Sequence, residues 1–206
     1  MKSDKLMEKI MPVVDGMQKN IYVSSITNGM MGTMGVMMAS AIFQLIYSFP
    51  ITPWTNFLQS IGLYSLLTTV VNICNLTAIF MVFNIGRTLG EKKGVDGIQT
   101  GLASLLCFLI ITPLEEVAGD FGSTIYINTS WLGAQGIFTA MIVALIAPTL
   151  YAFCINHNIV IKLPDAVPEF VSKNLSGIPS ALATVVPFVA IRGIFEMTAW
   201  GSFTSF

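Results

Sequence analysis

The chain reads Asn158-Ile-Val-Ile-Lys-Leu-Pro-Asp-Ala-Val-Pro-Glu-Phe-Val-Ser-Lys-Asn-Leu-Ser-Gly-Ile-Pro179 between two long apolar runs. Four charged side chains in this segment are costly to place in lipid: Lys162, Asp165, Glu169 and Lys173. Pro164 and Pro168 prevent one continuous helix. We therefore expect the segment to lie at a membrane surface, where it joins two packed spans.

The composition is that of an integral membrane protein. Of the 206 residues, 54% are hydrophobic and 10% are charged, and the mean hydropathy is +0.75. A soluble domain carries about 25% charged residues. The expected surroundings are therefore a lipid bilayer. A formal net charge of -1 provides no basic field, so we expect no nucleic-acid partner.

Five apolar runs approach the length of about 20 residues that a membrane-spanning helix needs. The predicted spans are residues 26–46, 66–85, 98–112, 136–153 and 178–200. Charged and apolar positions alternate over residues 1–20, which predicts an amphipathic helix on the bilayer surface. The expected fold class is all-α: a polytopic membrane protein with about five transmembrane helices and this N-terminal surface helix.

The positive charges predict the orientation of the spans. Lys and Arg occur within residues 2–19, 87–93 and 162–173, whereas the loops at 47–64 and 113–135 contain neither. Because cytoplasmic loops are enriched in Lys and Arg, this alternation predicts a cytoplasmic N-terminus.

Small residues predict where the helices pack closely, since lipid tails provide no hydrophobic drive for helix association. Gly29, Gly32 and Gly35 follow one another at intervals of three, and the pairs Gly86/Gly90 and Gly97/Gly101 flank a predicted cytoplasmic loop. In the second run, the amides of Asn72, Asn75 and Asn84 are expected to form hydrogen bonds between helices.

Arg192 and Glu196 are four residues apart in the fifth run, so they share a helix face and can form an ion pair. Ionisable groups in a membrane helix mark candidate functional sites. Two roles remain open for this pair, structural pairing and direct contact with a substrate.

No motif in the sequence indicates catalysis, a cofactor or a metal. The three cysteines are scattered without C-x-x-C spacing, and His157 is the single histidine, expected in a surface loop. Phosphate-binding, nucleophile-elbow and zinc-protease motifs are missing from the sequence. We therefore expect no catalytic residues, no cofactor and no metal site.

Two motifs carry a family resemblance. Ile161-Lys-Leu-Pro-Asp-Ala-Val-Pro168 and Thr129-Ser-Trp-Leu-Gly-Ala-Gln-Gly136 resemble segments of the membrane permease component, enzyme IIC, of bacterial phosphotransferase systems of the lactose/cellobiose/chitobiose family. They occur in the family's order and at span boundaries, and the resemblance covers essentially the whole chain. Glu169 departs from the family pattern, in which a second proline is usual.

The resemblance implies a bacterial plasma-membrane protein that takes part in phosphoenolpyruvate-dependent uptake of a β-linked disaccharide such as cellobiose, chitobiose or lactose. It implies that residues 1–206 form the N-terminal interface half, which dimerises, and that the chain ends before the transport half with its essential His and Glu. A cytosolic IIB protein would phosphorylate the sugar. By itself the chain is then incomplete as a transporter and is not an enzyme.

Gly133, Gln135 and Gly136 lie in the region that borders the sugar cavity in the resembled family. Glycines permit close backbone approach, and the Gln amide offers a donor and an acceptor to sugar hydroxyls. With Arg192 and Glu196, they are the candidate substrate-binding residues. The alternative for the first three is a tight turn that caps the fourth span.

Two further alternatives remain open. The chain could be a non-transporting membrane scaffold or regulatory subunit that dimerises with a full-length permease. The charges of Arg87, Glu91, Lys92 and Lys93 could either set topology or form a docking site for the phosphorylated partner.

Overall fold

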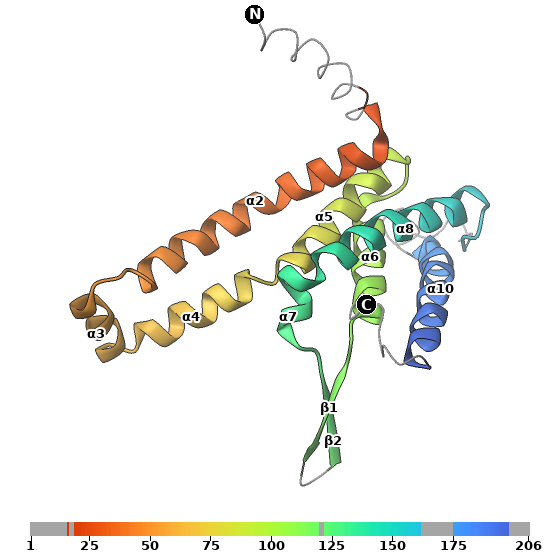
Figure 1. The fold of residues 1–206 in the computed structure, drawn as a ribbon. Coiled ribbons are helices and arrows are strands. Elements are labelled where there is room, and N and C mark those ends of the chain that lie inside the picture. Colours follow the sequence, from red (N-terminus) through yellow and green to blue (C-terminus); the bar gives the residue numbers. More distant parts are fainter. Residues whose placement is uncertain (1–15, 17–18, 120–121, 162–174, 198–206) are drawn as a thin grey trace, which may run out of the picture.

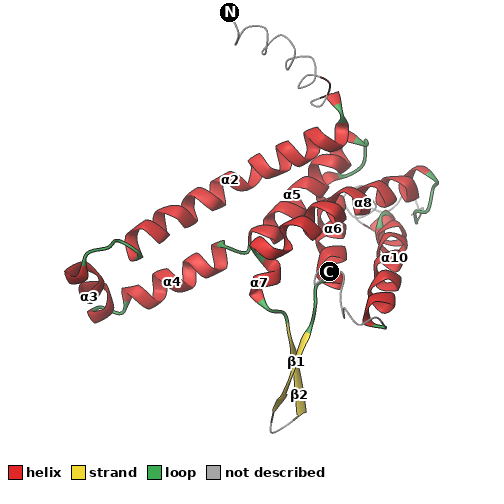
Figure 2. Ribbon diagram, viewed as in Figure 1, coloured by secondary structure: helices red, strands yellow, loops and turns green. Residues whose placement is uncertain are grey.

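The computed structural model describes residues 16, 19–119, 122–161 and 175–197. Helices make up nearly all of the regular structure in these residues (Figures 1 and 2). The all-α fold class predicted from the sequence is therefore confirmed. The helix predicted over residues 1–20 falls almost entirely outside the described residues. Residues 162–174, which contain most of the Ile161–Pro168 motif, also lie outside them.

The first long helix is α2, Ile21–Tyr47. It starts at Asn20, whose side-chain oxygen accepts a hydrogen bond from the backbone N–H of Tyr22 at 2.9 Å. Its 27 residues correspond to about 40 Å, which exceeds the roughly 30 Å of a bilayer's hydrocarbon core.

The second apolar run is not one uninterrupted helix. It forms α4, Leu63–Cys74, and α5, Thr77–Lys92, with a break at Asn75 and Leu76. The backbone leaves the helical region at Leu76, where φ is -71° and ψ is 50°. Just before the break, the Asn75 side chain accepts a hydrogen bond from the Ser40 hydroxyl of α2 at 3.2 Å, which links the end of α4 to α2.

A short helix connects α2 to α4. It is α3, Thr52–Ser60, with a proline in its first turn. The indole N–H of Trp54 donates to the carbonyl of Ile46 at 2.7 Å, and the rings of Tyr47 and Tyr64 meet edge to face at 5.7 Å. Figure 1 shows α2 and α4 side by side as an arm that extends from the other helices, with α3 at its tip.

The remaining long helices are α6, Gly97–Ile111; α8, Ile137–Asn156; and α10, Ile178–Glu196. Among the described residues, four elements are long and apolar enough to cross a membrane: Ile21–Tyr47, Leu63–Lys92, Ala134–Asn156 and Ile178–Glu196. Helix α6 is apolar but shorter. The described part of the chain therefore has the organisation of a multi-pass membrane protein.

A hairpin occupies part of the loop expected over residues 113–135. Strands β1, Glu115–Gly119, and β2, Gly122–Tyr126, pair antiparallel with Glu115 opposite Tyr126. It stands away from the helices in Figure 1 and is the yellow element of Figure 2. The sequence predicted only a loop here, and these strands are not among the expected elements.

Helix α5 lies at the centre of the packing, between α2, α6 and α8. A Cβ added at Gly29 of α2 would lie 2.6 Å from the Cα of Ile85, and one added at Gly86 would lie 2.7 Å from the Cβ of Ser104 in α6. Gly90 is equally close to Thr100. The predicted role of these glycines in close packing therefore agrees with the structure. Gly35 differs, since an added Cβ there would meet no atom within 4 Å.

Gly29→Ala is expected to lower the stability of the fold by about 1–3 kcal/mol, because the new methyl group overpacks the contact between α2 and Ile85. Gly35→Ala is the matched control and should leave the stability unchanged or raise it, since Ala favours helix over Gly. Thermal unfolding in detergent, followed by circular dichroism, measures both. Equal midpoints for the two variants would contradict the packing role of Gly29.

Candidate functional site

The residues between the hairpin and α8 form a compact turn. Helix α7, Thr129–Leu132, starts at Asn128, whose side chain accepts from the N–H of Ser130 at 3.0 Å. A 3-10 turn, η1 or Ala134–Gly136, then leads directly into α8. The tight turn that the sequence analysis considered for Gly133, Gln135 and Gly136 is therefore present.

Two glycines in this turn permit close backbone contacts. A Cβ added at Gly136 would collide with the carbonyl oxygen of Trp131, so the turn requires a glycine there. One added at Gly133 would lie 3.0 Å from the carbonyl oxygen of Asn75, at the break between α4 and α5. The turn and the helix break are therefore in direct proximity.

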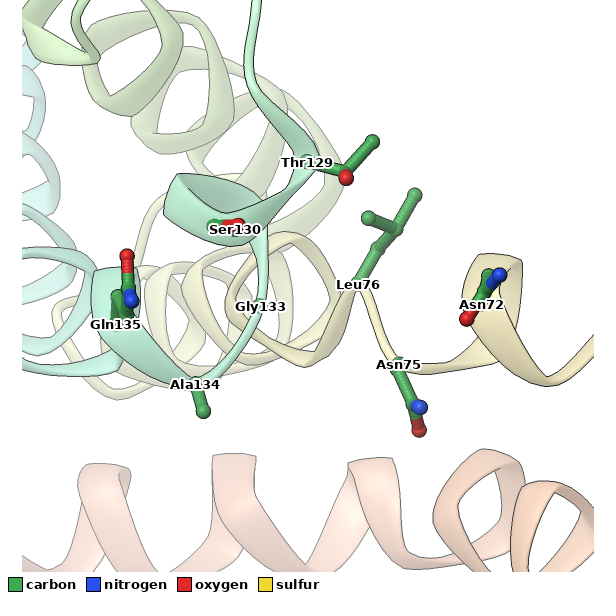
Figure 3. Close-up of a pocket in the computed structure, with 8 residues that line it drawn as sticks. All are labelled: Asn72, Asn75, Leu76, Thr129, Ser130, Gly133, Ala134 and Gln135. Atoms are coloured by element: carbon green, nitrogen blue, oxygen red, sulfur yellow. The ribbon is translucent and has the colours of Figure 1, made fainter. Parts of the chain in front are cut away.

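A cavity of about 570 Å³ lies where the turn meets the helix break. Figure 3 shows Asn72 and Asn75 at the end of α4, with Leu76 between them and the segment from Thr129 to Gln135; the Asn75 side chain points toward α2. The cavity is lined by Asn72, Asn75, Leu76, Thr129, Ser130, Gly133, Ala134 and Gln135.

The lining determines what the cavity can bind. Three side-chain amides and two hydroxyls offer both hydrogen-bond donors and acceptors. The eight lining residues are all uncharged. Such a wall suits a neutral ligand with many hydroxyl groups rather than an ion.

The structure separates the five candidate substrate-binding residues. Gly133 and Gln135 line the cavity, and Gly136 is buried behind it. Arg192 and Glu196 lie instead on α10, which Figure 1 shows apart from α7. The hydrogen bond between helices that was expected of Asn75 is present, to Ser40 of α2, but the place of Asn72 and Asn75 in the cavity wall was not predicted. Their spacing of three, on one helix face, was the available signal.

Arg192 has a structural environment. Its Nε lies 2.7 Å from Oε1 of Glu196, and its Nη1 donates to the carbonyl oxygen of Ile110 at 2.8 Å. Ile110 is in the last turn of α6, where backbone carbonyls lack partners within the helix. The guanidinium therefore caps α6 and links it to α10, which favours the structural role of the ion pair.

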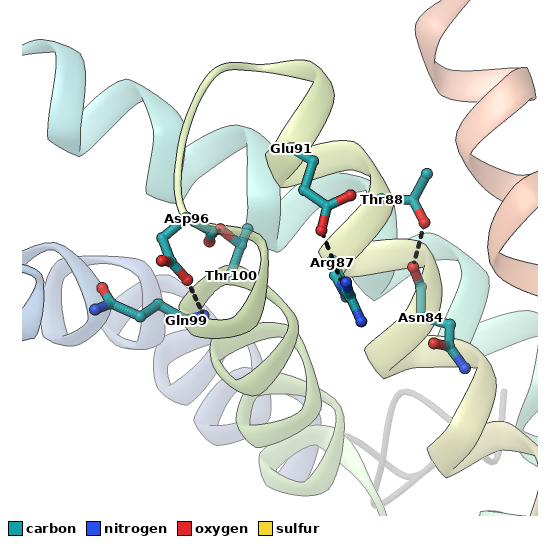
Figure 4. Close-up of polar contacts among 7 residues, drawn as sticks. All are labelled: Asn84, Arg87, Thr88, Glu91, Asp96, Gln99 and Thr100. Carbon is teal, nitrogen blue, oxygen red and sulfur yellow. Dashed lines mark hydrogen bonds and ion pairs between the residues drawn. The ribbon is translucent and has the colours of Figure 1, made fainter. Parts of the chain in front are cut away.

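The charges near the end of α5 also form local contacts. Figure 4 shows the ion pair of Arg87 and Glu91, at 2.8 Å, and the Asp96 carboxylate that accepts from the backbone N–H of Gln99 at the start of α6. Lys92 bonds to the Ser24 hydroxyl, and Lys93 bonds to the Tyr22 hydroxyl at 3.2 Å. These lysines hold the start of α2 against the end of α5.

His157 ends α8 as a capping residue. Its Nδ1 lies 2.9 Å from the carbonyl oxygen of Phe153, and the two rings stack with centroids 3.9 Å apart. Within the part of the chain that the structure describes, no three His, Cys, Asp or Glu residues are grouped as metal ligands.

A carboxylate connects the hairpin to the turn that carries the cavity. Glu115 accepts hydrogen bonds from the Tyr126 hydroxyl at 2.7 Å and from the side-chain amide of Asn128 at 3.1 Å. These bonds stabilise the charged form and hold the pKa of Glu115 below its ordinary value of 4.5. Asn128 is also the residue that caps α7, so Glu115 supports the start of the turn.

Comparison with known proteins gives consistent matches. The family model described as phosphotransferase system, EIIC, matches residues 27–206. The cellobiose-specific EIIC component of Geobacillus stearothermophilus is 32% identical over 96% of this chain and 46% of its own length. The lactose-specific EIICB component of Lacticaseibacillus casei is 26% identical over 87% of this chain and 31% of its own length.

A solved structure matches almost the entire chain. The crystal structure of ChbC, the IIC component from the N,N'-diacetylchitobiose-specific phosphotransferase system, superposes with a TM-score of 0.85 at 30% identity. The match covers 97% of this chain and 49% of that protein. The chain therefore spans less than half the length of these three relatives.

The contribution of Glu115 to stability is expected to disappear in acid. Because its folded-state pKa is lowered, the contribution is complete above about pH 4.5 and is lost as the pH falls through the lowered pKa. Glu115→Gln should therefore lower the unfolding midpoint at pH 7 and have no effect at strongly acidic pH. Glu116→Gln controls for the loss of one charge. A midpoint difference that persists unchanged in acid would contradict this explanation.

Arg192→Gln is expected to destabilise the protein by about 1–3 kcal/mol, because it removes the donor to the Ile110 carbonyl along with the ion pair. Glu196→Gln should have a smaller effect, since the bond from Arg192 to Ile110 remains. The comparison of unfolding midpoints in detergent tests this ranking. A larger effect for Glu196→Gln would show that the ion pair, and not the cap on α6, is the important contact.

Proposed function

Because the chain belongs to the phosphotransferase system EIIC family, we propose that it takes part in the phosphoenolpyruvate-dependent uptake of a β-linked disaccharide such as cellobiose, chitobiose or lactose. The observation that carries the proposal is the uncharged, amide-rich cavity lined by Gly133 and Gln135. Amide side chains offer the paired donors and acceptors that sugar hydroxyls require.

The proposed role is that of the N-terminal interface half of a permease. The chain would form a homodimer in the bacterial plasma membrane, while a second half would complete the transport path. A cytosolic IIB protein would carry out phosphoryl transfer, so this chain would not itself be an enzyme. The name EIICB of the lactose-specific relative is consistent with a functional link between IIC and IIB.

The proposed orientation places the N-terminus in the cytoplasm. Lys93 contacts Tyr22, and Lys92 contacts Ser24. The start of α2 and the end of α5 therefore lie at the same level, as they must if both face one compartment. The positive charges near both ends favour the cytoplasm as that compartment.

The second candidate is a scaffold or regulatory subunit that dimerises with a full-length permease and binds no sugar. The length of the chain relative to its relatives motivates this alternative. Arg192 and Glu196 remain candidates for substrate contact under the first proposal, although their capping contacts favour a structural role.

Sugar binding by the purified chain separates the two proposals. We expect saturable binding of radiolabelled cellobiose, lactose or chitobiose, with competition among β-linked disaccharides and none from maltose. Gln135→Ala should lower the affinity for the sugar about 5- to 100-fold through the loss of hydrogen bonds. Gln59→Ala, which removes an exposed amide in α3, should leave the affinity unchanged.

Uptake in the source cells tests the wider role. Deletion of the gene is expected to reduce phosphoenolpyruvate-dependent uptake of at least one of these sugars. Reduced uptake without sugar binding would support the scaffold. Unchanged uptake of all three would contradict participation in β-disaccharide transport.

A further inference from the structure

The break between α4 and α5 brings two amides to the cavity that the predicted site did not include. We infer that Asn72 and Asn75 are sugar-binding residues, whose side chains contact hydroxyl groups of an uncharged saccharide in the same cavity as Gln135. This inference rests on the proposed function and adds residues from a second structural element to its site.

Asn72 and Asn75 both line the cavity and are both exposed. Asn72 is in the last turn of α4, and Asn75 is the C-cap residue three positions later, so both lie at this end of the helix. The other part of the lining supplies the amide of Gln135 and the hydroxyls of Thr129 and Ser130 (Figure 3). The polar groups of the cavity wall therefore come from two segments that are more than 50 residues apart in the sequence.

A hydrogen bond from α2 orients the Asn75 side chain. The hydroxyl of Ser40, which is only 5% exposed, donates to Oδ1 of Asn75 at 3.2 Å. This bond engages the amide oxygen and leaves the Nδ2 group, with its two hydrogens, to donate to a ligand oxygen. Ser40 is therefore a positioning residue for Asn75. An oriented donor binds with less loss of conformational entropy than a side chain that must first become ordered.

The described cavity wall carries no charged side chain. The eight described lining residues offer amides, hydroxyls and apolar groups. A phosphorylated sugar would have to bring its dianion into the cavity without an Arg or Lys partner from this wall, which is unfavourable. The site should therefore prefer the free sugar to its phosphate.

A purely structural role for Asn75, as the link between α4 and α2, makes different predictions. Loss of that link would lower stability without a selective effect on sugar affinity. Asn72 separates the two roles, because it lines the same cavity and the Ser40 bond does not involve it.

The experiment measures affinity and stability together in the purified chain. The probes are radiolabelled cellobiose, lactose and chitobiose, and cellobiose 6′-phosphate is the charged competitor. Asn72→Ala and Asn75→Ala should each weaken sugar binding about 5- to 100-fold through lost hydrogen bonds. Ser40→Ala should weaken it less, since the Asn75 amide is retained but not held. Asn56→Ala, an exposed amide in α3, is the control and should bind as the unmodified chain does.

The competitor tests the preference for an uncharged ligand. Cellobiose 6′-phosphate should bind about tenfold more weakly than cellobiose, and Gln135→Lys should narrow that ratio by adding a cation to the cavity wall. Equal affinity for both sugars in the unmodified chain would overturn the preference.

Three further outcomes would each overturn the inference. Sugar binding that is unchanged in both Asn72→Ala and Asn75→Ala would overturn the inference while the proposed function stands. Weaker binding accompanied by an equal effect of Asn56→Ala would also overturn it, because the effect would not depend on the cavity. No binding of any probe by the folded chain would overturn both the inference and the sugar-binding role of this chain.

Discussion

The close packing of α5 against α2 and α6 is the constraint on which the rest of the described structure depends. Gly29 brings α2 onto the backbone of Ile85, and Gly86 receives Ser104 of α6 on the other side. In lipid, contact of this kind replaces the hydrophobic effect as the reason for helices to associate. Because α5 is held from two sides, its first residue and the break before it occupy a defined place beside α7.

The helix break turns a packing arrangement into a candidate binding site. An uninterrupted helix over Leu63–Lys92 would bond its own backbone carbonyls throughout. At the break, the Asn75 carbonyl lies against Gly133, while the Asn75 side chain bonds to Ser40. On the side of the turn, the absence of a side chain at Gly133 permits this close contact with the Asn75 carbonyl. Together, these two irregular segments line a cavity that is large enough for a sugar and has uncharged, polar walls.

The sequence predicted the helical membrane fold because hydropathy and loop charge are local properties. A motif before the fourth apolar run also drew attention to Gly133 and Gln135, which line the cavity. The sequence did not predict the break at Leu76 or the strands from Glu115 to Tyr126, because the apolar run continues past the break and the hairpin lies in a segment without a long apolar run. Arg192 was placed among the candidate ligand contacts because the sequence does not reveal its bond to the Ile110 carbonyl, which joins residues 82 positions apart. Asn72 and Asn75 were expected to form hydrogen bonds between helices; their place in a cavity depends on a turn more than 50 residues away in the sequence.

The most direct test of the account is an experimental structure of the protein with a bound β-linked disaccharide. We expect density for the sugar between the end of α4 and the Thr129–Gln135 segment, with amide groups of Asn75 and Gln135 at hydrogen-bonding distance from its hydroxyls. Sugar density located elsewhere, with this cavity occupied only by water or lipid, would contradict the central claim that the helix break and the facing turn form the binding site.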